Sequence, residues 1–426
     1  RQCTQRGIAD NCKPGVDGYA EADQAVSSEQ ALLEIISGIA QLLTCKLWGD
    51  IGDSFGRRAV LMSPCIYLIV NNLGLALLPA TSFVFIFGPL SFVASLFGGA
   101  YVASHVAFAT VADVTRGCSP ATRSLCFSIE EAFLWAGLLA GPFVSGFLID
   151  LLGAQNVFFV AAGGGFLNLV VTYFSFHETL EPERRRPFRL ARGNPCATLP
   201  MVMHSRSTFF MALAFLFAQF TANGGVSLII LDALNFTDSS ELLGYLVAVN
   251  NGMQCFGLVV IMPVLIKFLS LRQILLFSLF MGFVSWNCYA IVTDGWQMLV
   301  CSLLTPANAA FFPVVRTGMA NTFGAQKYGE SLAAVGVLQQ IASTSGTVVL
   351  SKVFSFTNHE IMLTSGFGIR CVAFTVAGVC AFFGFLAALG TGNIPSESRS
   401  EESQSNVCRS SISNLAEKLV HTVPEA

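Results

Sequence analysis

Long apolar runs recur along the 426-residue chain, separated by short polar loops. Eleven runs come close to or exceed the roughly 18 residues that a membrane-spanning helix needs. They are 31–48, 59–79, 83–112, 126–150, 156–176, 208–231, 242–266, 273–293, 297–321, 331–355 and 367–390. Because lipid cannot satisfy backbone hydrogen bonds, each run is predicted to be an α-helix. The run 83–112 is too long for a straight span, so we expect it to be tilted or to extend past the membrane.

The composition supports the same interpretation. Apolar residues make up 54% of the chain and charged residues only 12%, about half of what a soluble domain carries. The net charge of −3 excludes a basic nucleic-acid binder, and no catalytic triad, phosphate loop or metal-ligand cluster is apparent. The sequence therefore predicts an all-α polytopic membrane protein in a lipid bilayer, which is not an enzyme and has no nucleic-acid partner, metal or cofactor.

Basic residues in the loops predict the orientation of the chain. With the N-terminus outside, the inner loops hold thirteen Lys and Arg residues and the outer loops none. The thirteen are Arg57, Arg58, Arg116, Arg123, Arg184, Arg185, Arg186, Arg189, Arg192, Arg206, Lys267, Arg272 and Lys327. We therefore expect the N-terminus outside and the C-terminus in the cytoplasm. Asn235-Phe236-Thr237 is a candidate N-glycan acceptor on an outer loop, and nothing indicates which membrane holds the protein.

The longest inner loop divides the spans into five and six. The predicted organisation is an extracytoplasmic segment 1–30, an N-terminal bundle 31–176, a cytoplasmic linker 177–207, a C-terminal bundle 208–390 and a cytoplasmic Ser-rich tail 391–426. The charge run within the linker is interpreted as a solvated positive-inside segment rather than as a binding site.

The most specific motif follows the first span and reads GDIGDSFGRR from Gly49 to Arg58. Its glycines, including Gly49 and Gly56, favour a tight turn. Asp53 is predicted to cap a helix start or to meet the dipole of a neighbouring helix. Arg57 and Arg58 are expected to anchor the turn at the membrane interface.

This motif resembles the signature loop GxxxDRxGRR of the major facilitator superfamily, in which the positions of Gly49, Asp53, Gly56, Arg57 and Arg58 form a gate. The departure is Ser54, where the family usually has Arg, and it puts one gating ion pair in doubt. Further elements follow in the order expected of the branch that contains tetracycline-resistance antiporters and proton-coupled folate transporters. One of them is the sequence His177-Glu178-Thr179-Leu180, which resembles the end of the family's sixth helix.

A second element of the resemblance lies in the fourth run. Its sequence from Gly137 to Gly146 is similar to the GxxxGPxxxG element of proton-driven drug antiporters. Gly137 and Gly141 are expected to let another helix approach closely, and Pro142 to bend the helix axis.

The resemblance implies the major facilitator fold, in which twelve helices form two six-helix bundles. Eleven spans are visible, and the signature loop follows the first of them instead of the second. We therefore expect the family's first helix to lie upstream of residue 1, with a native eleven-helix protein as the alternative.

Charged side chains within spans are costly and mark candidate functional positions. Glu130 and Glu131 differ by about 100° around one helix, so both cannot point into the same cavity. Glu131 aligns with an acidic position of the folate transporters and is the preferred proton-coupling group, with an interfacial carboxylate as the alternative. The resemblance also makes Arg316 a substrate-binding or gating residue, against a snorkelling cation, and Asp113 a gating or structural carboxylate.

The predicted function is secondary active transport of a small organic solute by alternating access, coupled to protons through Glu131. Export by antiport is slightly favoured over import by symport. The alternative is a non-transporting membrane receptor or scaffold with a transporter-like fold, which would bind a ligand without moving it.

Overall fold

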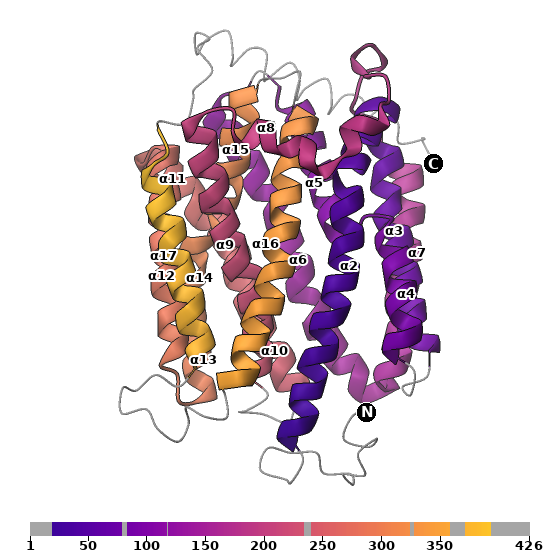
Figure 1. Ribbon diagram of the computed structural model, residues 1–426, viewed down its shortest axis with the longest axis vertical. Helices are drawn as coiled ribbons and strands as arrows, with labels where there is room; N and C mark the ends of the chain where they lie inside the picture. Colours follow the sequence, from indigo (N-terminus) through magenta and orange to yellow (C-terminus); the bar gives the residue numbers. More distant parts are fainter. Residues whose placement is uncertain are drawn as a thin grey trace, which may run out of the picture.

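The computed structural model describes residues 19–78, 83–116, 118–233, 240–323, 328–357 and 371–392. Regular structure in these ranges is entirely helical (Figure 1). The first 18 residues, almost all of the predicted Ser-rich tail and the candidate glycan acceptor Asn235 lie outside the described residues.

The helices follow the apolar runs closely. In the first half they are α2 (Tyr19–Phe55), α3 (Arg57–Leu77), α4 (Phe83–Ser95), α5 (Gly99–Val114), α6 (Pro120–Leu152) and α7 (Ala154–Ser175). In the second half they are α9 (Arg206–Ala233), α10 (Ser240–Phe256), α11 (Met262–Phe268), α12 (Leu271–Ala290), α13 (Gly295–Ser302), α14 (Thr305–Ala309), α15 (Phe311–Phe323), α16 (Tyr328–Thr357) and α17 (Val372–Leu389).

Most of these helices can cross a membrane. In the described part of the chain, eight are long and apolar enough to do so, and a bent pair makes a ninth. The remaining two predicted spans correspond to α4 with α5 and to the 28-residue helix α9. The polytopic all-α prediction is therefore confirmed.

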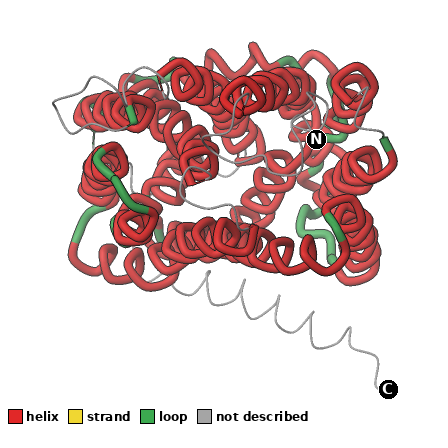
Figure 2. The backbone as a smooth tube through the Cα atoms, turned by 90° about the horizontal axis from the view of Figure 1, so that it is seen from below, coloured by secondary structure: helices red, strands yellow, loops and turns green. Residues whose placement is uncertain are grey.

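The helices form two bundles that pack side by side. In the first, α3 packs against α5 and α7, and α2 packs against α4; in the second, α9 and α12 pack against α17. The bundles meet mainly through α2 against α16 and α6 against α10, with α5 and α15 adding contacts near the centre. Figure 2, which looks along the helices, shows them arranged as one elongated ring.

The expectation of one long helix over 83–112 is wrong. The run divides into α4 and α5 because Gly98 and Gly99 have φ angles of 101° and 57°, which L side chains rarely adopt. The indole N–H of Trp48 donates a hydrogen bond to the carbonyl oxygen of Leu96 at the break, with an N–O distance of 2.9 Å. The run is apolar on both sides of the break, so the sequence pattern does not indicate that the helix is interrupted.

Two further predicted spans are helical but irregular. The run 297–321 is divided between α13 and the α14–α15 segment, which meet at 44°. The run 242–266 contains the π-helical turn η5 (Gly257–Ile261) between α10 and α11. The backbone of Pro306 lies so close to Gly257 that a side chain at Gly257 would overlap it. The two irregular spans therefore pack together at their irregular segments.

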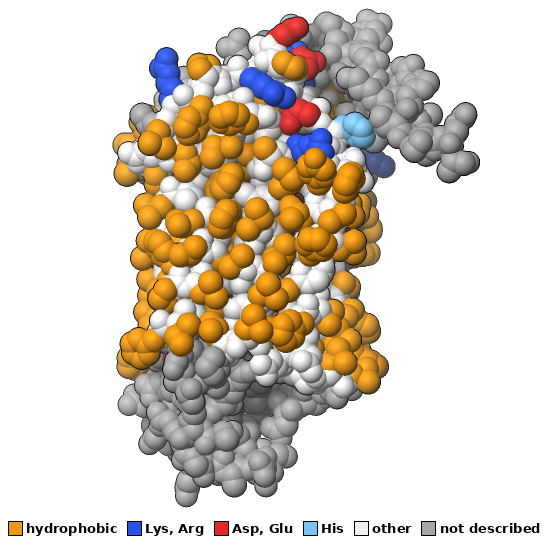
Figure 3. Space-filling view, turned by 90° about the vertical axis from the view of Figure 1, so that its right-hand side faces the viewer, with side chains coloured by type: hydrophobic (Ala, Val, Ile, Leu, Met, Phe, Trp, Pro, Cys, Tyr) orange, Lys and Arg blue, Asp and Glu red, His pale blue; other side chains and the backbone are white. Residues whose placement is uncertain are grey.

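The helices also place charge at one end of the molecule. On the face that Figure 3 draws, apolar side chains cover the middle of the molecule, and basic and acidic side chains gather above them. This end holds the α2–α3 junction, the start of α6, the segment 176–205 and the start of α16, and is called the charged end below. Helix α2 begins at Tyr19, within the segment 1–30 that the sequence predicts to be extracytoplasmic.

Candidate functional site

At the charged end, Arg57 is the centre of an ion cluster. Its guanidinium lies 2.7 Å from Oδ1 of Asp53 on α2 and 3.0 Å from Oδ2 of Asp113 on α5. Arg57 is buried, so it does not anchor the turn at an interface as the sequence predicted. Arg58 instead contacts the backbone carbonyl of Tyr173 on α7 and lies 4.8 Å from the centre of its ring. The motif and the separately predicted Asp113 therefore form one structural unit.

The turn in this motif consists of Gly56 alone, because α2 extends to Phe55 and α3 begins at Arg57. Gly56 has a φ of 111°, and a side chain there would overlap the carboxylate of Glu178. That carboxylate accepts hydrogen bonds from the backbone N–H groups of Arg57 and Arg58, at 2.9 and 3.2 Å. The prediction that Asp53 caps a helix is therefore wrong, because Glu178 caps α3 from a distant part of the chain.

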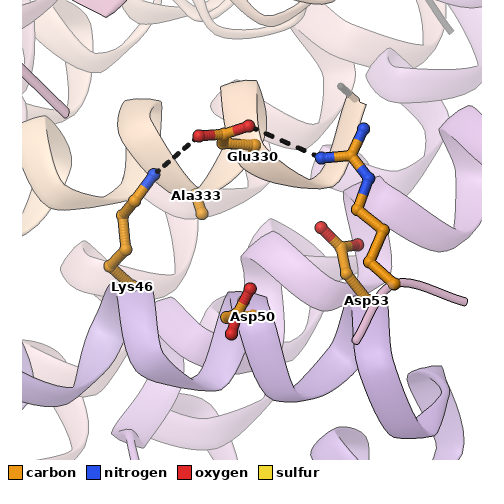
Figure 4. A pocket seen from close by; sticks show the side chains of 7 residues that line it. Lys46, Asp50, Asp53, Glu330 and Ala333 are labelled. Carbon is orange, nitrogen blue, oxygen red and sulfur yellow. Dashed lines mark ion pairs between the residues drawn. The ribbon is translucent and has the colours of Figure 1, made fainter. Parts of the chain in front are cut away.

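A second ion cluster joins the two bundles beside the first. Glu330 at the start of α16 lies 3.8 Å from Nζ of Lys46 on α2 and 3.6 Å from the guanidinium of Arg186. Figure 4 shows Lys46, Asp50 and Asp53 along α2 facing Glu330 and Ala333 on α16, around a small pocket.

The segment between the bundles is held against α2. The backbone N–H of Arg186 donates to the carbonyl of Asp53 at 3.0 Å, and that of Arg189 donates to Oδ2 of Asp50 at 3.2 Å. The rings of Phe188 and Phe55 lie 6.0 Å apart. Through Arg186 the linker therefore contacts both bundles.

Deeper in the molecule, Glu131 of α6 and Arg316 of α15 form a salt bridge. Only 2% of the surface of Glu131 and 1% of that of Arg316 is exposed. The guanidinium also donates to Oε1 of Gln339 on α16 at 3.1 Å and lies 3.8 Å from the ring centre of Phe108 on α5. Four helices, two from each bundle, thus enclose one ion pair.

This pair lies at membrane depth. Glu131 is eleven residues beyond the start of α6 at Pro120, or roughly 16 Å along the helix axis, about half the hydrocarbon thickness. Such burial does not fit an interfacial Glu131 or a snorkelling Arg316. Breaking a buried pair by removing one partner leaves a charge uncompensated, so the two residues depend on each other.

The glycine motif of α6 packs differently from the prediction. Within the described part of the chain, nothing lies within 4 Å of where a Cβ of Gly137 or Gly141 would be. The close approach begins at the next residue of the motif, where a Cβ of Gly244 on α10 would be 2.9 Å from the carbonyl of Pro142 and 3.9 Å from the Cα of Gly146. The predicted helix packing is therefore wrong for Gly137 and Gly141, while Pro142 and Gly146 lie at the contact between the bundles.

A neutral polar cluster also bridges the bundles. The hydroxyl of Tyr101 on α5 donates to Oδ1 of Asn223 on α9 at 3.3 Å and contacts the hydroxyl of Ser343 on α16. The amide of Asn223 in turn donates to Oε1 of Gln219 at 2.6 Å. The sequence does not single out Tyr101, whose neighbours along the chain are mostly small and apolar.

These features define a polytopic membrane protein whose two helical bundles are joined by buried ionic and polar contacts. A sequence profile described as the Major Facilitator Superfamily matches residues 22–347, and the chain belongs to that superfamily. The predicted fold and superfamily are thereby confirmed.

Comparisons with known proteins agree with this assignment. The chain is 22% identical over 343 residues to the class C tetracycline resistance protein of Escherichia coli, covering 80% of this chain and 84% of the relative. Its fold is similar to the human organic anion transporter MFSD10 (TETRAN), with a TM-score of 0.63, 16% identity and coverage of 91% and 87%. It is also similar to the Escherichia coli fucose:proton symporter FucP, with a TM-score of 0.61, 11% identity and coverage of 88% and 94%.

Proposed function

We propose that this protein is a proton-coupled secondary active transporter that moves a small organic solute by alternating access. The observation that carries the proposal is the buried pair of Glu131 and Arg316, because it joins the two bundles at membrane depth through a group that can take up a proton. Protonation of Glu131 would remove its charge and weaken the attraction across the interface. Arg316 would then keep Gln339 and the ring of Phe108 as partners.

The ion clusters at the charged end support alternating access. Glu330 of the second bundle is paired with Lys46 of the first, so this end is closed in the present conformation. Arg57 and its two carboxylates would hold the helices of the first bundle rigid while the bundles move against each other. We place the charged end in the cytoplasm, because basic loop residues concentrate there.

Export by antiport is the direction that we favour. The support is the similarity to a tetracycline resistance protein over most of both chains, together with the antiporter-like sequence around Pro142. Import by symport is the other direction, and the likeness to a fucose:proton symporter extends to the fold alone.

The test is transport in proteoliposomes under an imposed pH gradient of either direction, with tetracycline, fucose and tetraphenylphosphonium as solutes. The proposal predicts that at least one solute accumulates against its own gradient and that a protonophore abolishes this accumulation. Saturable binding of a solute in detergent without flux in either direction would contradict it. That result would favour the receptor or scaffold alternative, which is supported by Ser54 at the position where the signature motif usually has Arg.

A further inference from the structure

His105 of α5 packs into the space left by a glycine of α16. A Cβ added at Gly336 would overlap the imidazole, so only glycine leaves room for this ring. Helix α5 belongs to the first bundle and α16 to the second, and the two helices are in contact. The fit of His105 against Gly336 therefore exists only while the bundles are closed at this place.

The imidazole of His105 is enclosed and lacks a hydrogen-bond partner at one nitrogen. It lines a small pocket with residues of α2, α3 and α16, namely Cys45, Gly49, Arg57 and Ala333. Only 6% of its surface is exposed, and within the described structure its Nε2 is buried without a hydrogen bond. A neutral imidazole can leave Nε2 without a proton, whereas an imidazolium has an N–H on both nitrogens. The closed conformation thus offers no acceptor for a proton at Nε2.

The charges around His105 also oppose a further positive charge. Arg57 lines the same pocket, and the guanidinium of Arg316 lies 3.8 Å from the ring centre of Phe108, less than one turn from His105 along α5. Arg316 is itself paired with Glu131. The carboxylates of α2, α5 and α16 on the charged side of this pocket already have partners, namely Asp50, Asp53, Asp113 and Glu330. Protonation in the closed conformation would place an unpaired cation beside two arginines.

We propose that His105 is a second proton-responsive residue of the transport cycle, which permits the charged end to close only while its imidazole is neutral. Separation of α5 from α16 exposes Nε2 to water, where an imidazole takes up a proton as the pH falls below about 6.5. Because the proton binds only to the open conformation, it stabilises that conformation. This inference rests on the alternating access proposed above. Glu131 carries the coupling in that proposal, whereas His105 controls the closure of one end.

The test is the distance between spin labels on the two bundles, measured by pulsed electron paramagnetic resonance on the full chain in detergent. The labels are placed at the charged end by Arg184→Cys and Phe268→Cys, because both positions are exposed. The exposed Cys196 is replaced by Ser. From about pH 7.5 to about pH 5.5, the ratio of the long to the short distance should rise about tenfold. In His105→Gln, which cannot take up a proton, this ratio should stay the same.

A second pair of variants tests the fit against α16 at constant pH. Gly336→Ala leaves no room for His105, so the long distance should increase already at about pH 7.5. Adding His105→Ala restores the room and should return the short distance at both pH values. Recovery of the short distance in the double variant distinguishes steric opening from misfolding. The matched histidine control is His204→Gln, which removes an exposed imidazole from the charged end and should keep the pH dependence of the wild type.

Three results overturn the inference. They are a His105→Gln variant whose distances change with pH as those of the wild type do, a wild type whose distances do not change with pH, and a Gly336→Ala variant that stays closed. The measurement requires no solute and no flux. Failure of His105 as a proton-responsive residue is therefore distinguishable from failure of the transport proposal.

Discussion

Arg57 Nε donates a hydrogen bond to Asp113 Oδ2 at 3.0 Å, which joins the start of α3 to the end of α5 across 56 residues of sequence. The same guanidinium contacts Asp53 at the end of α2. One buried cation therefore holds three helix ends together. The motif from Gly49 to Arg58 thus stabilises the helix packing at the charged end.

Replacing Arg57 with Ala should lower the free energy of unfolding by about 3–5 kcal/mol, because it leaves two carboxylates without their cation. Thermal unfolding in detergent measures this effect as a fall in melting temperature. Arg184→Ala is the control, because the pair of Arg184 and Glu181 is exposed and should contribute less than about 1 kcal/mol. An equal fall in melting temperature for the two substitutions would contradict this stabilising role of Arg57.

Glu178 is expected to stabilise the start of α3 as a cap. Glu178→Ala removes the acceptor of two backbone N–H groups and should cost about 1 kcal/mol. The same unfolding assay applies, with Glu183→Ala as a matched carboxylate deletion in the same segment. A melting temperature identical to that of the wild type would rule out a capping role.

The pair of Lys46 and Glu330 should control how far the bundles separate at the charged end. Cys45 of α2 is buried and lines a pocket with His105 of α5 and Ala333 of α16. Its thiol therefore serves as a native reporter of how far the bundles separate. Lys46→Glu places like charges opposite each other and should destabilise the closed conformation by about 1 kcal/mol. The open conformation then becomes about fivefold more populated, so a soluble maleimide should alkylate Cys45 about fivefold faster. Peptide mass spectrometry measures the rate.

Adding Glu330→Lys to Lys46→Glu restores opposite charges and should return the alkylation rate of Cys45 towards that of the wild type. Cys65 is buried in α3 and serves as the internal reference, whose rate should not change. If the reversed pair leaves Cys45 as reactive as the single substitution does, the ion pair does not hold this end closed.

Much of the fold could be predicted from the sequence, because an apolar run long enough to cross a bilayer has few alternatives to a helix. The irregular segments could not. In a soluble helix a break interrupts the amphipathic pattern, whereas the residues on both sides of Gly98 are almost uniformly apolar.

Individual site residues were predictable for a similar reason, since a charge such as Glu131 or Arg316 is conspicuous within an apolar run. Their pairing was not, because 185 residues separate them and a sequence alone does not specify which helices face each other. The capping role of Glu178 likewise depends on the approach of a distant segment to the start of α3.

The most direct test of the central claim separates solute exchange from solute accumulation in proteoliposomes. Glu131→Gln keeps the size of the side chain and an acceptor for Arg316 but cannot take up a proton. We predict that this variant still exchanges labelled for unlabelled solute without a gradient, whereas accumulation driven by a pH gradient falls to background. Glu130→Gln should retain both activities. A Glu131→Gln variant that accumulates solute in a pH gradient as well as the wild type does would contradict proton coupling through Glu131.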